Sequence, residues 1–289
     1  MKPSIAVAIV NYNTRDLLSR CLDALFAQGV SVPFEVWVVD NASLDGSVEM
    51  LAERYPQVKV IANSENLGFA EANNQIMRAA DAESVFLLNT DTEIREGALQ
   101  ALWDLLQAHP RHGMVAAALV NPDGSPQPSV VPTRFPWAFS PISREERLRW
   151  ASGAAVLVRS ETIREIGLLD PRFFYTGEDC DWGLRARRAG WNVIANPRAV
   201  VMHIGGATRD SLPRRAKEAL HVGRHHYFLK HYGLPGKAYA NLHSLIELTG
   251  ETLKAFRRLP RQEARESARA HWDLLRRCWG YKLEGDLGR

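Results

Sequence analysis

The chain has 289 residues, 46% hydrophobic and 24% charged, a balance that excludes a wholly disordered protein. No apolar run approaches the ~18 residues that a membrane-spanning helix needs. The net charge of +3 is unevenly spread, because residues 1–202 carry a net −5 and residues 203–289 a net +8. A basic C-terminal part indicates an anionic partner for that part, either the phosphates of a substrate or a membrane surface.

Two features of the sequence bear on the compartment in which the protein works. The cysteines, Cys21, Cys180 and Cys278, are few, odd in number and without metal-ligand spacing, which is typical of a reducing cytoplasm. The short apolar run at the N-terminus has no small-residue cleavage site and is interrupted at once by Asn11 and Asn13. We therefore interpret that run as a buried first strand and expect a cytoplasmic protein.

The first 120 residues alternate between strand-like and helix-like segments. This alternation predicts a doubly wound, mostly parallel sheet with helices on its faces, a Rossmann-like nucleotide-binding half. Because the strand segments are almost continuously apolar, we expect them to be buried on both sides. The predicted strands are 5–10, 34–39, 58–62 and 85–88, and the predicted helices are 15–27, 46–54 and 69–79.

The pattern continues less regularly to about residue 203. A proline-rich stretch at 121–141 has no clear period and is predicted to be a loop, of the length that often serves binding. From about residue 214 the sequence is helical and basic, and it is interrupted at Gly233 and Pro235. The predicted strands are 114–120, 152–158, 191–195 and 199–203, and the predicted helices are 96–108, 161–166, 179–189, 214–232, 238–259 and 263–281.

Polar side chains follow each of the first four predicted strands directly. In doubly wound sheets, ligands bind outside the carboxyl ends of the strands, so these residues are expected to face a ligand. They are Asn11, Asp40 with Asn41, Asn63 with Asn66, and Asn89-Thr90-Asp91.

Asp91 and His203 are candidate metal ligands. Mg²⁺ and Mn²⁺ prefer oxygen ligands and are often held by one or two carboxylates together with substrate phosphates. An aspartate after a strand equally often caps a turn, and a lone histidine at a strand end is more often an ordinary polar residue. Taken singly, each residue leaves both readings open.

Glu178, Asp179 and Asp181 place three carboxylates within four residues. Their mutual repulsion favours a positive partner or a proton-accepting role. Acidic residues also stabilise a helix N-terminus through its dipole. The helix start and the functional role are compatible if the first turn of the helix fixes the position of Asp179 and its side chain faces the ligand.

An ordered set of motifs resembles the family 2 inverting glycosyltransferases of the GT-A fold, and within them a rhamnosyltransferase-like branch. The resemblance covers roughly residues 3–235. The motifs are VAIVNYNTRDLLSRCLDAL, VVDNASLDGS, NSENLGFAEANN, LLNTDTEI, SGAAVLVR, GLLDPRFFYTGEDCDWGLRARRAGW and HIGGAT.

The resemblance implies a role for each matching residue. Asp179 matches the catalytic base, with Glu178 as its neighbour, and His203 matches a metal ligand. Asn89-Thr90-Asp91 matches the D-x-D metal motif, but Asn89 replaces its first aspartate, so only Asp91 is expected to bind Mg²⁺ or Mn²⁺ directly. The residues expected along the nucleotide and the donor are Asn11, Asp40, Asn66, Gly68, Asn73, Asn89, Thr90 and Asp91.

This assignment agrees with the chemistry of glycosyl transfer. A cation held by Asp91 and His203 would neutralise the charge that develops on the nucleoside diphosphate as it leaves. The acceptor hydroxyl has a high pKa and needs a base within hydrogen-bond reach, for which Asp179 is the candidate. Direct displacement with inversion is implied by the resemblance alone. The resemblance also favours a dTDP-rhamnose donor and a saccharide or lipid-linked acceptor in cell-envelope polysaccharide synthesis.

The expected organisation is a GT-A catalytic domain at 1–235 and a basic helical extension at 236–289. The catalytic domain divides into a donor half at about 1–120 and an acceptor half at about 121–235. In the latter, Trp137 and Trp182 are candidates for contact with the acceptor. The extension is expected either to pack on the catalytic domain or in a homodimer, or to touch the inner membrane leaflet.

Two other functions were weighed against this one. Nucleotidyl transfer uses a similar core, but the stretch after the first strand, NYNTRD, lacks a glycine-rich basic phosphate loop. A non-catalytic nucleotide- or carbohydrate-binding protein is disfavoured by the intact Asp91, Asp179 and His203. Nothing in the sequence indicates a nucleic acid partner.

Overall fold

The computed structural model describes residues 3–132, 140–173, 176–205, 213–258 and 260–280. By its internal contacts the chain forms two units. An α/β unit comprises residues 1–171 and 178–211, and a helical unit comprises residues 172–177 and 212–289.

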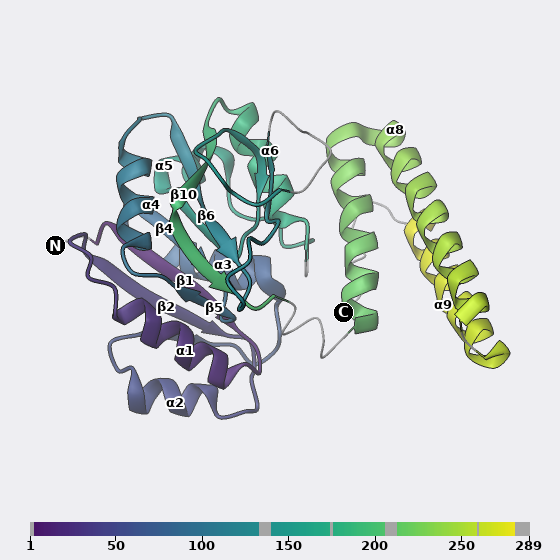
Figure 1. The fold of residues 1–289 in the computed structure, drawn as a ribbon, viewed down its shortest axis with the longest axis horizontal. Coiled ribbons are helices and arrows are strands. Elements are labelled where there is room, and N and C mark those ends of the chain that lie inside the picture. The colour runs from purple at the N-terminus through teal and green to yellow at the C-terminus, as the bar shows by residue number, and fades with distance from the viewer. Residues whose placement is uncertain (1–2, 133–139, 174–175, 206–212, 259, 281–289) are drawn as a thin grey trace. The chain divides into compact units, whose positions relative to one another are not determined.

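The α/β unit is built on a sheet of eight described strands in the order β3-β2-β1-β4-β9-β6-β10-β5 (Figure 1). A separate pair, β7-β8, lies apart from this sheet in the hydrogen-bonding order. The strands are β1 (Ile5–Asn11), β2 (Phe34–Asp40), β3 (Lys59–Ala62), β4 (Ser84–Leu88), β5 (Thr92–Ile94), β6 (His112–Val120), β7 (Val130–Pro132), β8 (Leu148–Ala151), β9 (Ala155–Arg159) and β10 (Asn192–His203).

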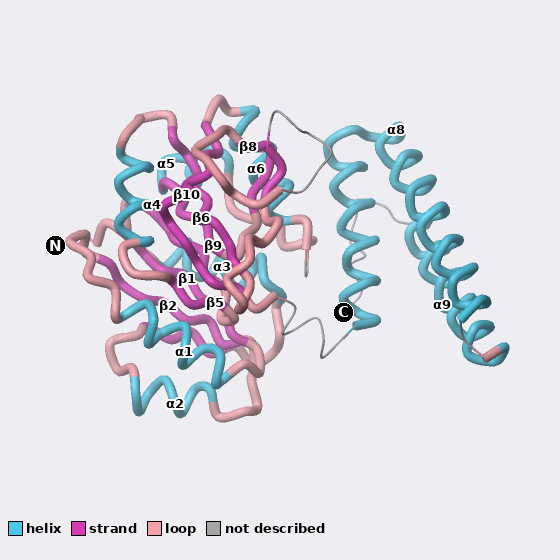
Figure 2. Tube along the Cα trace, in the orientation of Figure 1, coloured by secondary structure: helices cyan, strands magenta, loops and turns pink. Residues whose placement is uncertain are grey.

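Strand directions confirm the mostly parallel sheet. Strand β1 runs parallel to β2 and β4, β2 parallel to β3, and β6 parallel to β10. Only β9, which lies between β4 and β6, and the edge strand β5 run antiparallel to their neighbours among the described residues. The helices of this unit are α1 (Arg15–Phe26), α2 (Ser47–Arg54), α3 (Gly68–Ala79), α4 (Ala98–Gln107), α5 (Ser160–Ile166) and α6 (Glu178–Arg188) (Figure 2).

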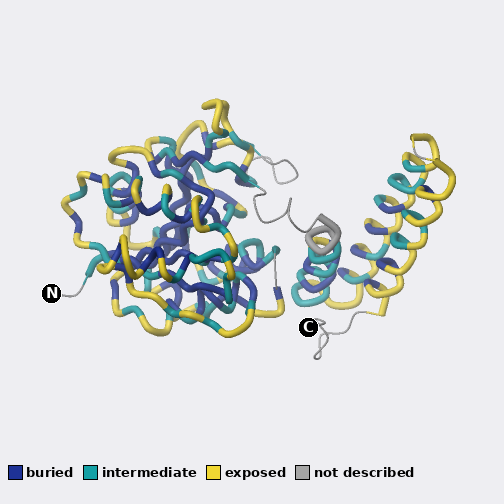
Figure 3. The backbone as a smooth tube through the Cα atoms, turned by 90° about the horizontal axis from the view of Figure 1, so that it is seen from below, coloured by how far each residue is buried: buried dark blue, intermediate teal, exposed yellow. Residues whose placement is uncertain are grey.

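Alternating apolar side chains bury both faces of the sheet. In β4, Phe86 and Leu88 join one core cluster, and Val85 and Leu87 join the other. Leucines of α1 and α4 pack into the first cluster, whereas α3, α5 and α6 contribute to the second. Burial on both sides explains why the central strands are almost continuously apolar. Strand β3 departs from the expectation: it forms the sheet edge and is largely exposed. In Figure 3, buried residues gather in the interior of the α/β unit and exposed residues on its outside.

Strand β10 also differs from the sequence prediction, which placed two short strands around Asn196-Pro197-Arg198. The structure has one continuous strand whose register against β6 shifts between Asn196 and Val200. A proline cannot donate a hydrogen bond to a neighbouring strand, so it is accommodated at such a bulge. The prediction of two strands was wrong, because a proline at a bulge and a proline between two strands give the same sequence pattern.

The helical unit consists mainly of α8 (Pro213–Arg258) and α9 (Arg261–Gly280). Helix α8 breaks at Gly233, whose φ of 61° lies outside the helical region, as the sequence indicated. Leu248 on α8 and Leu274, Leu275 and Cys278 on α9 form a small apolar core between the helices. Among the described residues, no helix is both long enough and apolar enough to cross a bilayer.

Candidate active site

Asp91 and His203 are brought together by the pairing of β5 with β10. Asp91 lies just before β5, and His203, the last residue of β10, is the register partner of Thr92. The backbone N–H of Ile204 donates to the carbonyl oxygen of Asp91 at 3.0 Å. As a result, Oδ1 of Asp91 lies 3.3 Å from Nε2 of His203.

Gln127 fixes the orientation of the His203 ring. Its amide nitrogen donates to Asn121 Oδ1 and to the carbonyl oxygen of His203, so its Oε1 faces Nδ1 of His203 at 2.7 Å and accepts the proton there. Nε2 therefore faces the Asp91 carboxylate. Ligand histidines in metal sites are commonly held in this way by an acceptor on the other ring nitrogen.

This arrangement fits a divalent cation. A carboxylate oxygen and an imidazole nitrogen that present lone pairs to each other need a positive charge between them, from a proton or from a metal ion. Neighbouring ligands about 2.1 Å from an octahedral ion lie about 3.0 Å apart, close to the observed 3.3 Å. No group of three or more His, Cys, Asp or Glu side chains gathers within the described ranges, so water and substrate phosphates would complete the shell.

Asn11 and Asp40 form a second, buried part of the site. They are register partners at the carboxyl ends of β1 and β2, and Asn11 Nδ2 donates to Asp40 Oδ2 at 2.7 Å. The backbone N–H of Ser43 donates to the other oxygen, Oδ1, at 2.8 Å. An ionised carboxylate has about four acceptor positions, so Asp40 keeps capacity for a ligand hydroxyl or base.

Thr14 connects these residues to the segment that carries Asp91. Its hydroxyl donates to Asn11 Oδ1 at 2.7 Å and lies 3.1 Å from the hydroxyl of Thr90. Asn89, Thr90 and Asp91 thus stand beside the Asn11–Asp40 pair. The two groups that sequence analysis assigned to nucleotide and metal share one edge of the sheet.

Asn66, Gly68 and Asn73 shape the start of α3. Gly68 has a φ of 81°, a conformation that favours glycine, and its N–H donates to Asn66 Oδ1 at 2.9 Å. Asn73 Nδ2 donates to the carbonyl oxygen of Phe69. The oxygens Asn73 Oδ1 and Asn89 Oδ1 are buried and have no hydrogen-bond partner in the part of the chain that the structure describes.

Asp179 occupies the first turn of α6, where the helix dipole favours an acidic residue. Its Oδ2 accepts from the backbone N–H of Gly153 at 3.2 Å, and its Oδ1 accepts from that of Cys180 at 2.7 Å. Burial raises the pKa of Asp179, while the neighbouring Trp150 and the backbone N–H groups of Gly153 and Cys180 oppose the rise by stabilising the carboxylate. A carboxylate whose pKa is raised is a better proton acceptor.

Glu178 behaves differently from its neighbour. It is buried, and burial followed by the charge of Asp179 raises its pKa well above the usual range. Asp181, the third acidic residue, is fully buried and forms an ion pair with Arg185 at 2.8 Å. Burial and the charge of Asp179 thus favour the protonated form of Glu178. The role of Asp179 as the base stays a prediction.

The turn at Gly153-Ala154 joins the segment of Asp179 to the segment of Asp91. The N–H of Asn89 donates to the carbonyl oxygen of Ala154 at 3.0 Å, and the N–H of Gly153 binds Asp179. Within the described ranges no hydrogen bond joins Asp179 directly to Asp91 or Asp40, so this turn is the link between them. A narrow pocket lies beside the base, lined by residues that include Phe69, Gly153, Glu178, Asp179, Trp182 and Gly183.

The structure describes only one of the two tryptophans that were expected near an acceptor. Trp182 lines this pocket, but its side chain is buried in the core and its Nε1 donates to the carbonyl oxygen of Gly167 at 3.0 Å. Trp137 lies outside the described residues. Contact of either residue with an acceptor stays a prediction.

Sequence reasoning missed Gln127, Thr14, Ser43 and Gly153. Gln127 stands in the proline-rich loop, and nothing in its neighbourhood signals contact with a histidine far along the chain. Thr14 and Ser43 follow strand ends, so the rule that found Asn11 and Asp40 could have included them. Gly153 acts through its backbone N–H, which no residue type reveals.

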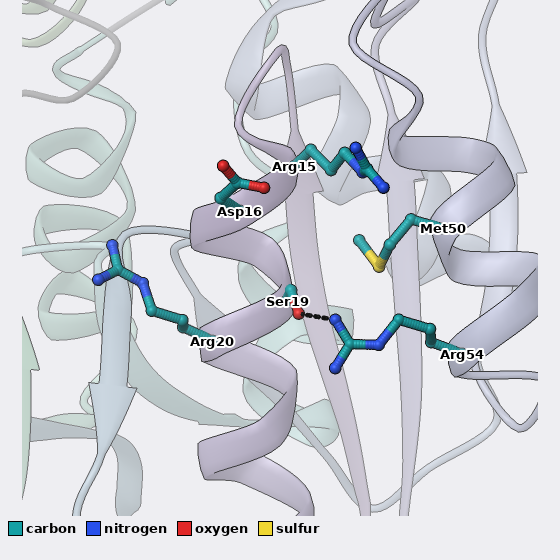
Figure 4. Close-up of a pocket in the computed structure, with 6 residues that line it drawn as sticks. All are labelled: Arg15, Asp16, Ser19, Arg20, Met50 and Arg54. Atoms are coloured by element: carbon teal, nitrogen blue, oxygen red, sulfur yellow. Dashed lines mark hydrogen bonds between the residues drawn. The ribbon is translucent and has the colours of Figure 1, made fainter.

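A separate hollow lies between α1 and α2 (Figure 4). Arg54 Nη1 donates to Ser19 Oγ there at 2.6 Å, and the Arg15 side chain extends toward α2. The hollow contains none of the predicted site residues. We therefore place the candidate active site at the carboxyl edge of the sheet and not in this hollow.

The fold and these residues agree with those expected of a glycosyltransferase. The chain belongs to glycosyl transferase family 2, whose model matches residues 6–165. This confirms the family that the sequence motifs indicated.

The similarity to characterised relatives extends over most of the chain. The chain is 30% identical over 261 residues to the N-acetylglucosaminyl-diphospho-decaprenol L-rhamnosyltransferase of Mycobacterium tuberculosis, covering 78% of this chain and 82% of that protein. It is 25% identical to the low-salt glycan biosynthesis hexosyltransferase Agl10 of Haloferax volcanii, covering 67% and 64%. The rhamnosyltransferase-like character expected from the motifs is confirmed as a similarity of sequence.

Solved structures confirm the GT-A fold. S. aureus TarS 1–349 in complex with UDP-GlcNAc matches with a TM-score of 0.61 and 17% identity, covering 96% of this chain and 81% of that one. The mannosyltransferase PcManGT from Pyrobaculum calidifontis in complex with GDP-Man and Mn²⁺ matches with a TM-score of 0.57 and 18% identity, covering 96% and 86%. At such identities the likeness is one of fold alone.

Proposed function

We propose that the protein transfers a sugar from a nucleoside-diphosphate sugar to a hydroxyl of a saccharide or lipid-linked acceptor, by metal-assisted single displacement with inversion. The observation that carries this proposal is the 3.3 Å approach of Asp91 to His203 Nε2 at the carboxyl edge of the sheet. A proton acceptor, Asp179, is joined to the same edge through Gly153 and Ala154.

Asp91 and His203 are the residues that would hold Mg²⁺ or Mn²⁺. When bound, the ion supplies positive charge to the departing diphosphate. Asp40 and Asn11 bind the nucleoside, and the Asn66–Asn73 segment lies along the donor. The buried, partnerless oxygens of Asn73 and Asn89 support a ligand here, because buried acceptors are normally satisfied.

Asp179 removes the proton from the acceptor hydroxyl as that oxygen attacks the anomeric carbon. The raised pKa of this carboxyl makes it a stronger base than an ordinary aspartate. Burial and the charge of Asp179 raise the pKa of the neighbouring Glu178, which lowers the repulsion between the two carboxyl groups.

The donor and acceptor are proposed from similarity. The relative from Mycobacterium tuberculosis is named for transfer of L-rhamnose to a diphospho-decaprenol-linked sugar, which supports dTDP-rhamnose as donor and a lipid-linked saccharide as acceptor for this chain. Such an acceptor belongs to cell-envelope polysaccharide synthesis, and the scarce free cysteines support action at the cytoplasmic face of the membrane.

The helical unit carries a surface that fits this acceptor. Tyr239, Leu242, Ile246, Leu253 and Phe256 recur at helical spacing on α8 and are exposed, Ile246 to 65%. We call these five residues the exposed stripe, and Lys254, Arg257, Arg258 and Arg261 lie at its end. Basic side chains near anionic lipid contribute about 1 kcal/mol each, so we propose that this face touches an anionic membrane.

A donor panel tests the proposed function. Purified protein is mixed with Mn²⁺ and each nucleotide sugar, with and without a short-chain lipid-linked saccharide, and release of nucleoside diphosphate is measured. We expect release to require the acceptor and to be fastest with dTDP-rhamnose. Binding of nucleotide sugars without any release would assign the chain to the non-catalytic alternative. Release of pyrophosphate in a separate mixture of a nucleoside triphosphate and a sugar 1-phosphate would assign it to nucleotidyl transfer.

Vesicle sedimentation tests the membrane contact. We expect binding to vesicles containing phosphatidylglycerol, weakened by added salt, and no binding to neutral vesicles. Replacing Leu242, Ile246 and Leu253 by glutamine should abolish it. If the protein does not bind these vesicles at low salt, and if light scattering shows a dimer that the same replacements dissociate, the exposed stripe contacts a second copy of the chain instead.

A further inference from the structure

The segment before the proposed base belongs to the helical unit. Residues 172–177 group with α8 and α9, whereas the chain on either side of them belongs to the α/β unit. Glu178, which begins α6, follows Gly177 directly, and Asp179 is the next residue. Phe173 and Thr176, whose contacts with α8 the structure describes, precede Asp179 by six and three residues.

Phe173 is the apolar anchor of the segment. Its side chain is 1% exposed, and its ring meets that of His226 on α8 edge to face, with centroids 4.5 Å apart. The ammonium of Lys230, one helical turn further along, lies 5.8 Å from the Phe173 ring centroid. Aromatic pairs in this geometry are favourable beyond the area that they bury.

Gly223 lets the segment approach the backbone of α8 closely. A Cβ atom at this position would lie 2.5 Å from the carbonyl oxygen of Thr176, a distance that real Cβ atoms essentially never show. Gly223, His226 and Lys230 are spaced by three and four residues, so they share one face of the helix. Glycine inside a helix is destabilising compared with alanine, and the close approach of Thr176 gives a reason for it here.

Gly177 is the last residue of the segment and directly precedes α6, which carries Asp179. Its φ of 103° is one that residues with a side chain rarely adopt, and a Cβ there would lie 2.9 Å from Cδ1 of Phe173. The backbone thus turns sharply between the contact with α8 and the start of α6.

We propose that the helical unit is a positioning element for catalysis: the α8 face formed by Gly223, His226 and Lys230 holds the segment that leads into Asp179. This inference rests on the proposed function, in which Asp179 is the base. Gly223 and His226 touch neither donor nor metal in this account and act through the placement of Asp179.

Gly223→Ala is the direct test. Ordinary contact begins at 3.4 Å and the added Cβ would meet Thr176 at 2.5 Å, so the segment must move by about 1 Å. A displacement of this size at a reacting group lowers turnover by up to ~10²-fold, so we expect kcat to fall by ~10–100-fold. Donor affinity should be unchanged, because Asp40 and Asp91 are on other elements. Hydrogen exchange of the amides in 176–183 should be faster.

Gly250→Ala is the matched control. Gly250 is also in α8, but a Cβ there meets nothing within 4 Å. The kcat and the hydrogen exchange of Gly250→Ala should therefore equal those of the wild type. In an Asp179→Asn background, Gly223→Ala should cause little further loss, because two residues that act through one group are not additive. If Gly223→Ala fails to fold, Phe173→Leu, which keeps an apolar side chain, takes its place.

The outcomes separate this inference from the proposed function. Wild-type hydrogen exchange in 176–183 of Gly223→Ala overturns the inference even if no donor is found. A wild-type kcat in Gly223→Ala overturns the inference as well. So does a double variant whose loss of kcat equals the product of the losses caused by Gly223→Ala and Asp179→Asn alone. If the wild type releases no nucleoside diphosphate with any donor, or if Asp179→Asn alone turns over normally, the proposed function fails instead.

Discussion

Replacement of Gln127 isolates the residue that orients His203. In Gln127→Leu the side chain no longer accepts the Nδ1 proton of His203, an interaction of 2.7 Å in the structure. The imidazole can then rotate or change tautomer, and Nε2 no longer faces Asp91. The substitution leaves both proposed metal ligands, Asp91 and His203, in the chain.

The expected magnitude follows from that single interaction. Loss of an outer partner of a metal-binding histidine typically weakens metal affinity by ~10–100-fold. This corresponds to about 1.4–2.8 kcal/mol, since each tenfold change is about 1.4 kcal/mol. Gln127→Glu keeps an acceptor opposite Nδ1 and should retain most of the affinity, which makes it the matched control.

The assay is a titration of Mn²⁺ against protein and a nucleoside diphosphate, followed by the electron paramagnetic resonance of free Mn²⁺. Transfer activity is measured over the same range of Mn²⁺ concentration. Gln127→Leu should require ~10–100-fold more Mn²⁺ for half-maximal activity and recover at saturation. Equal Mn²⁺ affinity in wild type and Gln127→Leu would refute the role of Gln127 and weaken the case for His203 as a ligand.

Three other predictions concern the charged residues of the site. Asp91→Ala should abolish transfer and weaken binding of the nucleoside diphosphate in calorimetry, with a milder effect for His203→Ala; activity of both variants in EDTA would contradict the metal model. Because Asp179 must be ionised to act and burial raises its pKa, kcat/KM should rise with pH through a value above that of an ordinary aspartate, whereas a limb at the ordinary value would argue against it as the base. Because the pKa of Glu178 is raised in the folded state, that state binds the proton more tightly than the unfolded state, and the stability gained from this proton is lost as pH rises above about 4.5. The melting temperature of Glu178→Gln should therefore increase relative to that of the wild type with increasing pH. A difference in melting temperature that does not change with pH would contradict this prediction.

Much of the fold could be predicted from local sequence pattern. The alternation of apolar runs with amphipathic segments located β1, β2 and β4 and the helices between them to within a residue or two. The short strands β5, β7 and β8 escaped, because three or four residues carry too little period to stand out. Strand β10 was divided in two because Pro197 at a bulge has the appearance of a break.

The sequence could predict which candidate site residues lie together where one structural rule applied, but not where packing across the chain decides. Asn11 and Asp40 could be found because the carboxyl ends of adjacent parallel strands meet at one edge. The contact of Gln127 with His203 depends on the path of a proline-rich loop, which has no period to read. The hold of α8 on Phe173 depends likewise on the fold of the helical unit.

The most direct test of the account is transfer by Asp179→Asn beside that by the wild type, with donor and Mn²⁺ affinity measured on both. The asparagine is nearly the same size but cannot accept a proton. The account predicts unchanged binding of nucleotide sugar and Mn²⁺, with release of nucleoside diphosphate in the presence of acceptor lowered by ~10²-fold or more. Wild-type turnover in the variant would contradict the role of Asp179, and an equal loss of Mn²⁺ binding would place Asp179 with the metal ligands instead.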